Sequence, residues 1–92
     1  MIENQIKNLI TENLDTIFFQ LDDLTEKHKT HDLYTSGRHY KVIIVSNTFH
    51  NMTLLERHKL IYAILKDMIK KEIHALSINA FTKKEFDIFI EN

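Results

Sequence analysis

The sequence predicts an α+β domain in which helices pack on one face of a small, three-stranded mixed sheet. Two observations lead to this fold class. The spacing of apolar residues changes between the period of about 3.6 residues of an amphipathic helix and the two-residue alternation of a strand. Two capping boxes also mark the starts of helices. The predicted order is helix, strand, strand, long helix, strand, short helix, within a single domain of residues 1–92.

The first helix is predicted over residues 2–14, where aliphatic residues recur at spacings of three and four: Ile2, Ile6, Leu9, Ile10 and Leu14. Alternating aromatic, aliphatic and polar residues then predict a strand over residues 16–22. A second strand is predicted over residues 40–46. Because it is apolar on both faces from residue 42 to residue 45, we expect it in the centre of the sheet. The two strands can pair antiparallel through the long polar loop of residues 24–38.

A capping box opens the second half of the chain. Thr53 and Glu56 can each satisfy a backbone group that the first turn of a helix leaves without a partner. A helix is predicted over residues 54–70, and the Lys70–Lys71 pair suits the negative end of its dipole. Its apolar stripe comprises Leu54, Leu55, His58, Ile61, Leu65, Met68 and Ile69.

The third strand is predicted over residues 73–80. It should lie parallel to the second strand, because a helical crossover joins the two and such connections are right-handed. A second capping box, Thr82 with Glu85, opens a short helix over residues 83–90.

The composition narrows the classes of function. The chain has 92 residues and a formal net charge of -1, so no overall basic field attracts it to nucleic acid or to anionic lipid. No apolar run approaches the ~20 residues that span a bilayer. We expect no membrane association. The protein is expected to be cytoplasmic and monomeric when alone. An organellar location, such as the mitochondrion, is the alternative if the chain is a trimmed form. The absence of Cys excludes disulfides, thiolate catalysis and cysteine-based metal sites.

No group of residues indicates an enzyme. Ser46 ends a strand and His50 follows it, but no nucleophile-elbow pattern surrounds the serine. Asp22 and Asp23 are neighbours on a strand, so their side chains point to opposite faces and do not converge. We therefore expect no catalytic residues and no independent activity.

A nucleic-acid-binding domain is an alternative. KH-type domains have a small sheet with helices and bind single strands through a GxxG loop, but the sequence has no such motif. The long helix has a partly basic face, which ordinary solvation explains equally well. Its residues are Lys59, Lys66, Lys70 and Lys71.

A metal site is the main question, because this small domain has 6 histidines and none forms the HExxH zinc motif. His39, at the start of a strand, is predicted to be structural, and His50 to be solvated in a turn. His28 and His31 lie in the long polar loop, from which a side chain could reach the sheet.

His74 is the most informative of the histidines. Strand alternation puts it on the same face as Leu76 and Ile78, so it is either a core histidine satisfied by one hydrogen bond or a metal ligand on a rigid strand. Together with a loop histidine, His28 or His31, it offers two imidazoles. Two ligands are too few for a closed four-ligand zinc site. The shortfall indicates a site shared with another molecule.

Several segments together resemble the BolA family. The resemblance runs from about Asp22 to Phe86 and covers RHYKVIIVSNTFHNMTLLERHKLIYAILK and EIHALSINAFTKKEF. Its most specific elements are His39-Tyr40-Lys41-Val42 running into Val45-Ser46, then Phe49, Arg57-His58, Tyr62 and His74-Ala75-Leu76. The resemblance implies a fold similar to class II KH domains, with the order α-β-β-α(α)-β-α, which agrees with the order derived above.

The resemblance also implies a function. Members of this family form heterodimers with monothiol glutaredoxins and share a bridged [2Fe–2S] cluster, for which the glutaredoxin supplies its cysteine and a bound glutathione thiol. The BolA side supplies the histidine of the His-Ala-Leu stretch, here His74, and a His or Cys from the loop. Since the chain has no Cys, the loop ligand must be a histidine. The implied function is a non-enzymatic adaptor in iron–sulfur cluster trafficking or iron regulation, and the isolated chain would hold no cofactor. The alternative, also known in the family, is a DNA-binding transcriptional regulator.

Two loop histidines compete for this one role. Counting forward from Asp23 selects His28, whereas counting backward from His39 selects His31. We prefer His28, because DLTEKH resembles the acidic run that precedes the loop histidine of the family. Asn51 stands where the family has a glycine, and Asn tolerates a left-handed backbone better than other non-glycine residues.

Arg57 and His58 follow the cap residue Glu56 and are interpreted as structural. They are expected to fix how the long helix sits on the sheet. Replacement of His58 should therefore reduce stability without removing the cluster.

Overall fold

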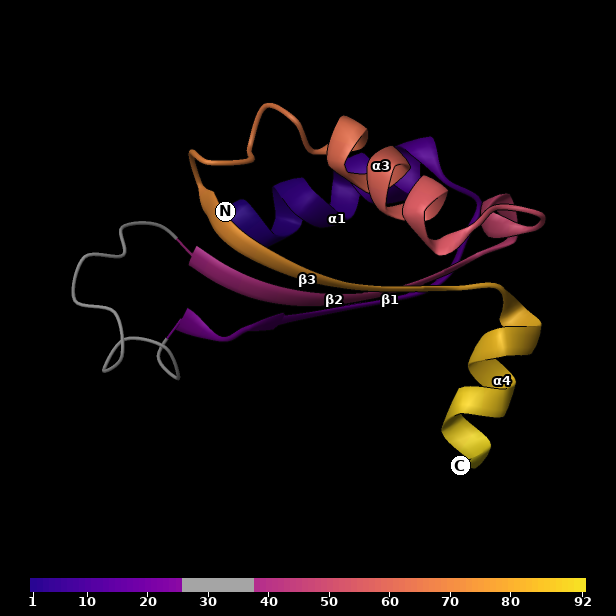
Figure 1. Ribbon diagram of the computed structural model, residues 1–92. Helices are drawn as coiled ribbons and strands as arrows, with labels where there is room; N and C mark the ends of the chain where they lie inside the picture. The colour runs from indigo at the N-terminus through magenta and orange to yellow at the C-terminus, as the bar shows by residue number, and fades with distance from the viewer. Residues whose placement is uncertain (26–37) are drawn as a thin grey trace.

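The computed structural model describes residues 1–25 and 38–92 (Figure 1). Its elements are α1 (Ile2–Asn13), β1 (Thr16–Asp23), β2 (Arg38–Ser46), the 3₁₀ turn η1 (Asn47–Phe49), α3 (Leu54–Ile64), β3 (Ile73–Phe81) and α4 (Lys83–Glu91). This order confirms the predicted α+β class. Across the two described ranges, no helix is both long and apolar enough to cross a membrane.

The strand β2 is the central strand of the sheet, as its two apolar faces predicted. It pairs antiparallel with β1, where Leu21 lies opposite Val42. It pairs parallel with β3, where Val42 lies opposite Ile78. The parallel arrangement is the one expected for two strands joined by a helical crossover.

The main hydrophobic core lies between the sheet and the two helices α1 and α3, which cover one face (Figure 1). Each fully buried aliphatic side chain stabilises such a core by about 1.5–3 kcal/mol. The buried side chains are Ile6, Ile10, Leu14, Tyr40, Val42, Ile44, Phe49, Ile61, Leu65, Met68, Ile73 and Ala80.

The helix α4 does not join the other two, contrary to the prediction that the helices pack on one face. It lies beyond the end of β3, on the other side of the sheet (Figure 1). The Phe86 ring stacks on Phe18 of β1 at 5.2 Å and lies 5.8 Å from the Phe81 ring. Phe89 lies 4.9 Å from Phe81. The cause is strand alternation: Ala80 belongs to the main core, so its neighbour Phe81 points to the opposite face, and the aromatic residues of α4 pack there.

The helix α3 is shorter than predicted. It ends at Ile64 and not near residue 70. The chain continues in tight turns, and the Met68 N–H donates to the Leu65 carbonyl at 2.8 Å. Lys70 has a φ of 69°, a left-handed conformation that cannot continue a right-handed helix. The lysine pair therefore does not sit at a helix end, although Leu65 and Met68 are buried as the predicted stripe required.

The buried side of α3 also differs from the predicted stripe at its start. Leu54 and Leu55 are 66% and 63% exposed, whereas Arg57 is only 5% exposed. Arg57 can occupy a buried position because its guanidinium is engaged in hydrogen bonds, as described below. Ile61 is buried as predicted.

The capping boxes and the left-handed turn predicted from the local sequence are confirmed. Both capping boxes are present, and the hydroxyls of Thr53 and Thr82 accept hydrogen bonds from the N–H groups of Glu56 and Glu85 at 3.1 and 3.3 Å. Asn51 has a φ of 64°, as expected for a residue in place of a glycine in a left-handed turn.

Candidate functional site

His74 lies at the start of β3 and is exposed, so it is not a core histidine. A shift of one residue in strand pairing accounts for this position. Ile73 pairs with Arg38, but the next pair joins Ala75 to His39, so His74 is an additional residue between the two pairs. A β-bulge of this kind changes the direction in which a side chain points.

The bulge resets the alternation of β3. Ile73 is 1% exposed and belongs to the main core, and Leu76 is partly buried and packs against the same core. In a regular strand, residues three apart point to opposite faces. His74 is therefore removed from the face that it was predicted to share with Leu76.

The structure brings His74 next to His39. The centroids of the two imidazole rings are 5.2 Å apart and their planes are inclined by 44°. Both backbone groups of His39 are bonded to the residues that follow β1: its N–H donates to Thr25 Oγ1 at 3.2 Å, and its carbonyl accepts from the Leu24 N–H at 2.7 Å. The sequence predicts a structural role for His39 and gives no indication that it lies beside His74.

The other histidines lie elsewhere. His50 is exposed directly after η1, at the end of the sheet opposite to His74. His58 is half-buried on α3. His28 and His31, the predicted loop ligands, lie outside the described residues. Among residues 1–25 and 38–92, no group of three or more His, Asp or Glu side chains is arranged to hold a metal ion.

Polar contacts fix the chain around this histidine pair. The Arg38 guanidinium donates to the Asp23 carboxylate at 3.2 Å, and the Thr25 N–H donates to the same carboxylate at 2.9 Å. The pKa of Asp23 lies below its usual value, chiefly because of a hydrogen bond with the Thr25 side chain, and the Thr25 N–H and Arg38 add to this effect. The Arg38 N–H also donates to the Glu72 carbonyl, just before the bulge. These bonds join the facing ends of β1, β2 and β3.

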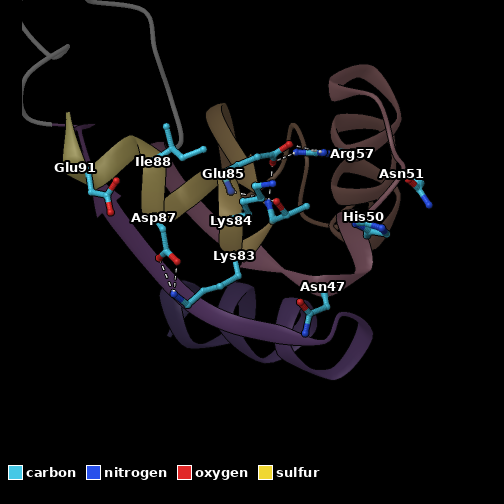
Figure 2. Close-up of a pocket in the computed structure, with 11 residues that line it drawn as sticks. Asn47, His50, Asn51, Arg57, Lys83, Lys84, Glu85, Asp87, Ile88 and Glu91 are labelled. Atoms are coloured by element: carbon cyan, nitrogen blue, oxygen red, sulfur yellow. Dashed lines mark hydrogen bonds and ion pairs between the residues drawn. The ribbon is translucent and has the colours of Figure 1, made fainter.

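A second polar cluster lies at the opposite end of the sheet. The buried Arg57 guanidinium binds both carboxylate oxygens of Glu85, at 2.6 and 3.1 Å (Figure 2). It also donates to the carbonyls of Met52 and Ala80. It also lies 5.7 Å from the centre of the Phe49 ring. The hydrogen bond from Arg57 lowers the pKa of Glu85 to about 2. Arg57 therefore connects α3, β3 and α4.

An open pocket of about 1010 Å³ adjoins this cluster, between η1 and α4 (Figure 2). Most of its charged side chains are already engaged: Arg57 with Glu85, and Lys83 with both oxygens of Asp87 at 2.6 and 2.8 Å. This pairing leaves the pocket with little net charge to attract an anion.

Two site features were missed from the sequence. The ion pair of Arg57 with Glu85 was only weakly indicated by the sequence, since Glu85 was identified there only as a residue of a capping box. The contact of His39 with His74 had none, because the two residues are distant in sequence and the one-residue shift follows no local pattern.

The family model of BolA-like proteins matches residues 10–85. This chain belongs to the BolA family. The match begins before Asp22, where the resemblance noted in the sequence began, and so includes the end of α1.

Individual relatives agree with this membership of the BolA family. A BolA-like protein of Dictyostelium discoideum is 38% identical over 86 residues, which cover 92% of this chain and 74% of that protein. The DNA-binding transcriptional regulator BolA of Escherichia coli is 29% identical over 87 residues, which cover 95% of this chain and 81% of that protein. The solved BolA domain of SufE1 from Arabidopsis thaliana aligns with a TM-score of 0.78 at 35% identity, over 89% of this chain and 92% of that domain.

Proposed function

We propose that this BolA-family chain is a non-enzymatic adaptor that binds a monothiol glutaredoxin and shares a [2Fe–2S] cluster with it through His74 and a second histidine. The observation that carries the proposal is the position of His74. It is exposed on a strand, and a β-bulge directs it away from the core and next to another imidazole. A ligand held on a strand is oriented more tightly than one on a loop.

The donor set of the chain fits this chemistry. It has histidines and no cysteine, so it can offer imidazole nitrogens while a partner offers thiolates. Two imidazoles on one iron and two thiolates on the other are known in Rieske centres, where they raise the reduction potential. For the second histidine, the sequence favours His28, with His31 as the alternative.

The test is reconstitution. The chain is mixed under anaerobic conditions with a monothiol glutaredoxin, glutathione, iron and sulfide, and the visible absorption and circular dichroism spectra are compared with those of the glutaredoxin alone. We expect a new spectrum for the mixture, and a different one for His74→Ala. His50→Ala is the matched control, since His50 is also exposed but lies at the other end of the sheet. Identical spectra for the wild type and His74→Ala would refute the proposed ligand.

A DNA-binding regulator is the second candidate, favoured by the Escherichia coli relative of that description. Phosphate contacts release counterions, so a regulator of this kind should lose DNA affinity steeply as the salt concentration rises. Measurement of DNA binding by fluorescence anisotropy at several salt concentrations separates the two functions. A steep slope supports the regulator, and an absence of binding at low salt supports the adaptor.

A further inference from the structure

We propose that His39 and His74 form a two-imidazole site for a single transition-metal ion of the Cu²⁺ or Zn²⁺ class, and that this site needs neither glutaredoxin nor the loop histidines. It shares His74 with the proposed cluster site but gives His39, which was predicted to be structural, the role of a ligand. Its existence does not depend on the proposed function.

The separation of the rings carries the proposal. Two imidazoles that bind one tetrahedral ion at a metal–nitrogen distance of ~2.0–2.1 Å place their ring centroids about 5 Å apart. The centroids of His39 and His74 are 5.2 Å apart, with ring planes inclined by 44°. The separation of the two rings therefore matches that of two imidazoles on a common ion.

The backbone makes this separation a property of the fold. Ala75, and not His74, pairs with His39, so the small side chain lies opposite the His39 ring and His74 is displaced beside it. The hydrogen bonds of His39 with Thr25 and Leu24 hold the facing strand. Two ligands on paired strands bind one ion more tightly than either alone, because the second bond forms at a high effective concentration.

The chemistry of the pair defines the ion. Imidazole suits Zn²⁺, Cu²⁺ and Ni²⁺, and Cu²⁺ binds most tightly among the divalent first-row ions. The Nε2 atom of His39 is buried within the protein, so Nδ1 is the nitrogen assigned to the ion. Since the described ranges provide no third clustered ligand, water or a partner would complete the coordination.

The experiment is a Cu²⁺ titration of the full chain, followed by calorimetry and by electron paramagnetic resonance. His74→Asn removes the exposed ligand, and His39→Phe removes the nitrogens while keeping the bulk of a half-buried ring. Each variant should bind Cu²⁺ roughly a hundredfold more weakly. The double variant should bind no more weakly than the single ones, because both residues serve one ion. The wild-type resonance spectrum should show coupling to two nitrogens.

Two matched controls accompany the titration. His50→Asn removes a histidine at the other end of the sheet, and the His28→Ala/His31→Ala variant removes both loop histidines. Both should bind Cu²⁺ like the wild type. If His39→Phe does not fold, nuclear magnetic resonance of the wild type decides, since substoichiometric Cu²⁺ should broaden the ring signals of His39 and His74 together.

Three results would overturn the proposal. These are additive losses in the double variant, unchanged affinity in His39→Phe, or loss of affinity on removal of the loop histidines. The titration contains no glutaredoxin, so failure of the proposed function leaves its result unaffected. If the Cu²⁺ titration is negative, the proposed cluster site still stands, with His74 and a loop histidine as its two ligands.

Discussion

At the scale of single residues, the described histidines differ chiefly in exposure and in support. His74 is exposed and lies at a bulge, whereas His39 is half-buried and its N–H and carbonyl are both bonded to the residues after β1. His58 is half-buried on a helix, and His50 is exposed after a 3₁₀ turn. These differences predict which substitutions affect ligand binding and which affect stability.

The two loop histidines should respond differently to substitution. We expect His28→Ala to change the cluster spectrum of the glutaredoxin complex more than His31→Ala, because His28 follows the segment that resembles the family's approach to its loop ligand. The comparison is made by visible circular dichroism at equal iron content, with His50→Ala as the control. A larger effect of His31→Ala would reverse the assignment.

His58 should matter for stability and not for ligands. His58→Ala removes a half-buried ring from α3, and we expect a loss of about 1 kcal/mol and a lower melting temperature. Cluster formation with glutaredoxin should persist at a temperature where the variant is folded. A variant with full stability and no cluster would show that His58 is a ligand and not a structural residue.

At the scale of elements, one buried guanidinium joins segments that are distant in sequence. Arg57 of α3 binds the carbonyl of Ala80 in β3 and the carboxylate of Glu85 in α4. The same carboxylate accepts the N–H of Thr82 at 2.8 Å and so also caps α4. The position of α4 therefore depends on a carboxylate that must be ionised.

This dependence predicts a loss of stability in acid. The hydrogen bond from Arg57 holds the pKa of Glu85 at about 2 in the folded chain, against an ordinary value of 4.5. A lowered folded pKa favours the folded state above the unfolded value, and this contribution disappears as the pH falls from 4.5 towards about 2. Because the Glu85 side chain is 45% exposed, solvent screening reduces the effect.

Glu85→Gln tests this prediction in thermal melts from neutral pH to acid. The variant should melt at a lower temperature near neutral pH, and its stability should change less between pH 4.5 and about 2 than that of the wild type. Asp23→Asn is a comparison variant, since the pKa of Asp23 is also lowered but its bonds lie at the other end of the sheet. An unchanged acid dependence in Glu85→Gln would rule out the contribution of Glu85.

At the scale of the whole molecule, the two faces of the sheet are covered unequally. The face under α1 and α3 contains the continuous core, with Ile6, Ile10 and Ile61 at 0% exposure. The helix α4 on the other side has no buried residue, and Ile88, Phe89 and Ile90 are 52%, 51% and 61% exposed. Few buried contacts therefore oppose the local opening of α4.

Hydrogen exchange should reveal this inequality. We expect amides of β2 and α1 to exchange only on global unfolding, and those of α4 to exchange at least roughly tenfold faster, through local opening. Phe86→Ala removes the ring that contacts Phe18 and Phe81, and it should increase exchange in α4 while leaving α1 unchanged. Uniform protection of α1 and α4 would contradict the prediction.

The sequence by itself determined the features that depend on neighbouring residues. The apolar period distinguishes helix from strand within a few residues, and a capping box involves residues three apart, so the elements, their order and the starts at Thr53 and Thr82 were predictable. The central place of β2 followed from its two apolar faces. Candidate ligands could be named by residue type, and His74 was among them.

Only the tertiary structure decided the features that depend on distant residues. The end of α3 at Ile64 depends on how the following turns pack, and the side taken by α4 depends on the direction of Phe81 at the end of β3. The exposure of His74 and its contact with His39 depend on a one-residue shift between β2 and β3. Strand register is set by the pairing of two segments and the packing of their faces, so a shift of one residue leaves no trace in the local sequence but redirects a side chain.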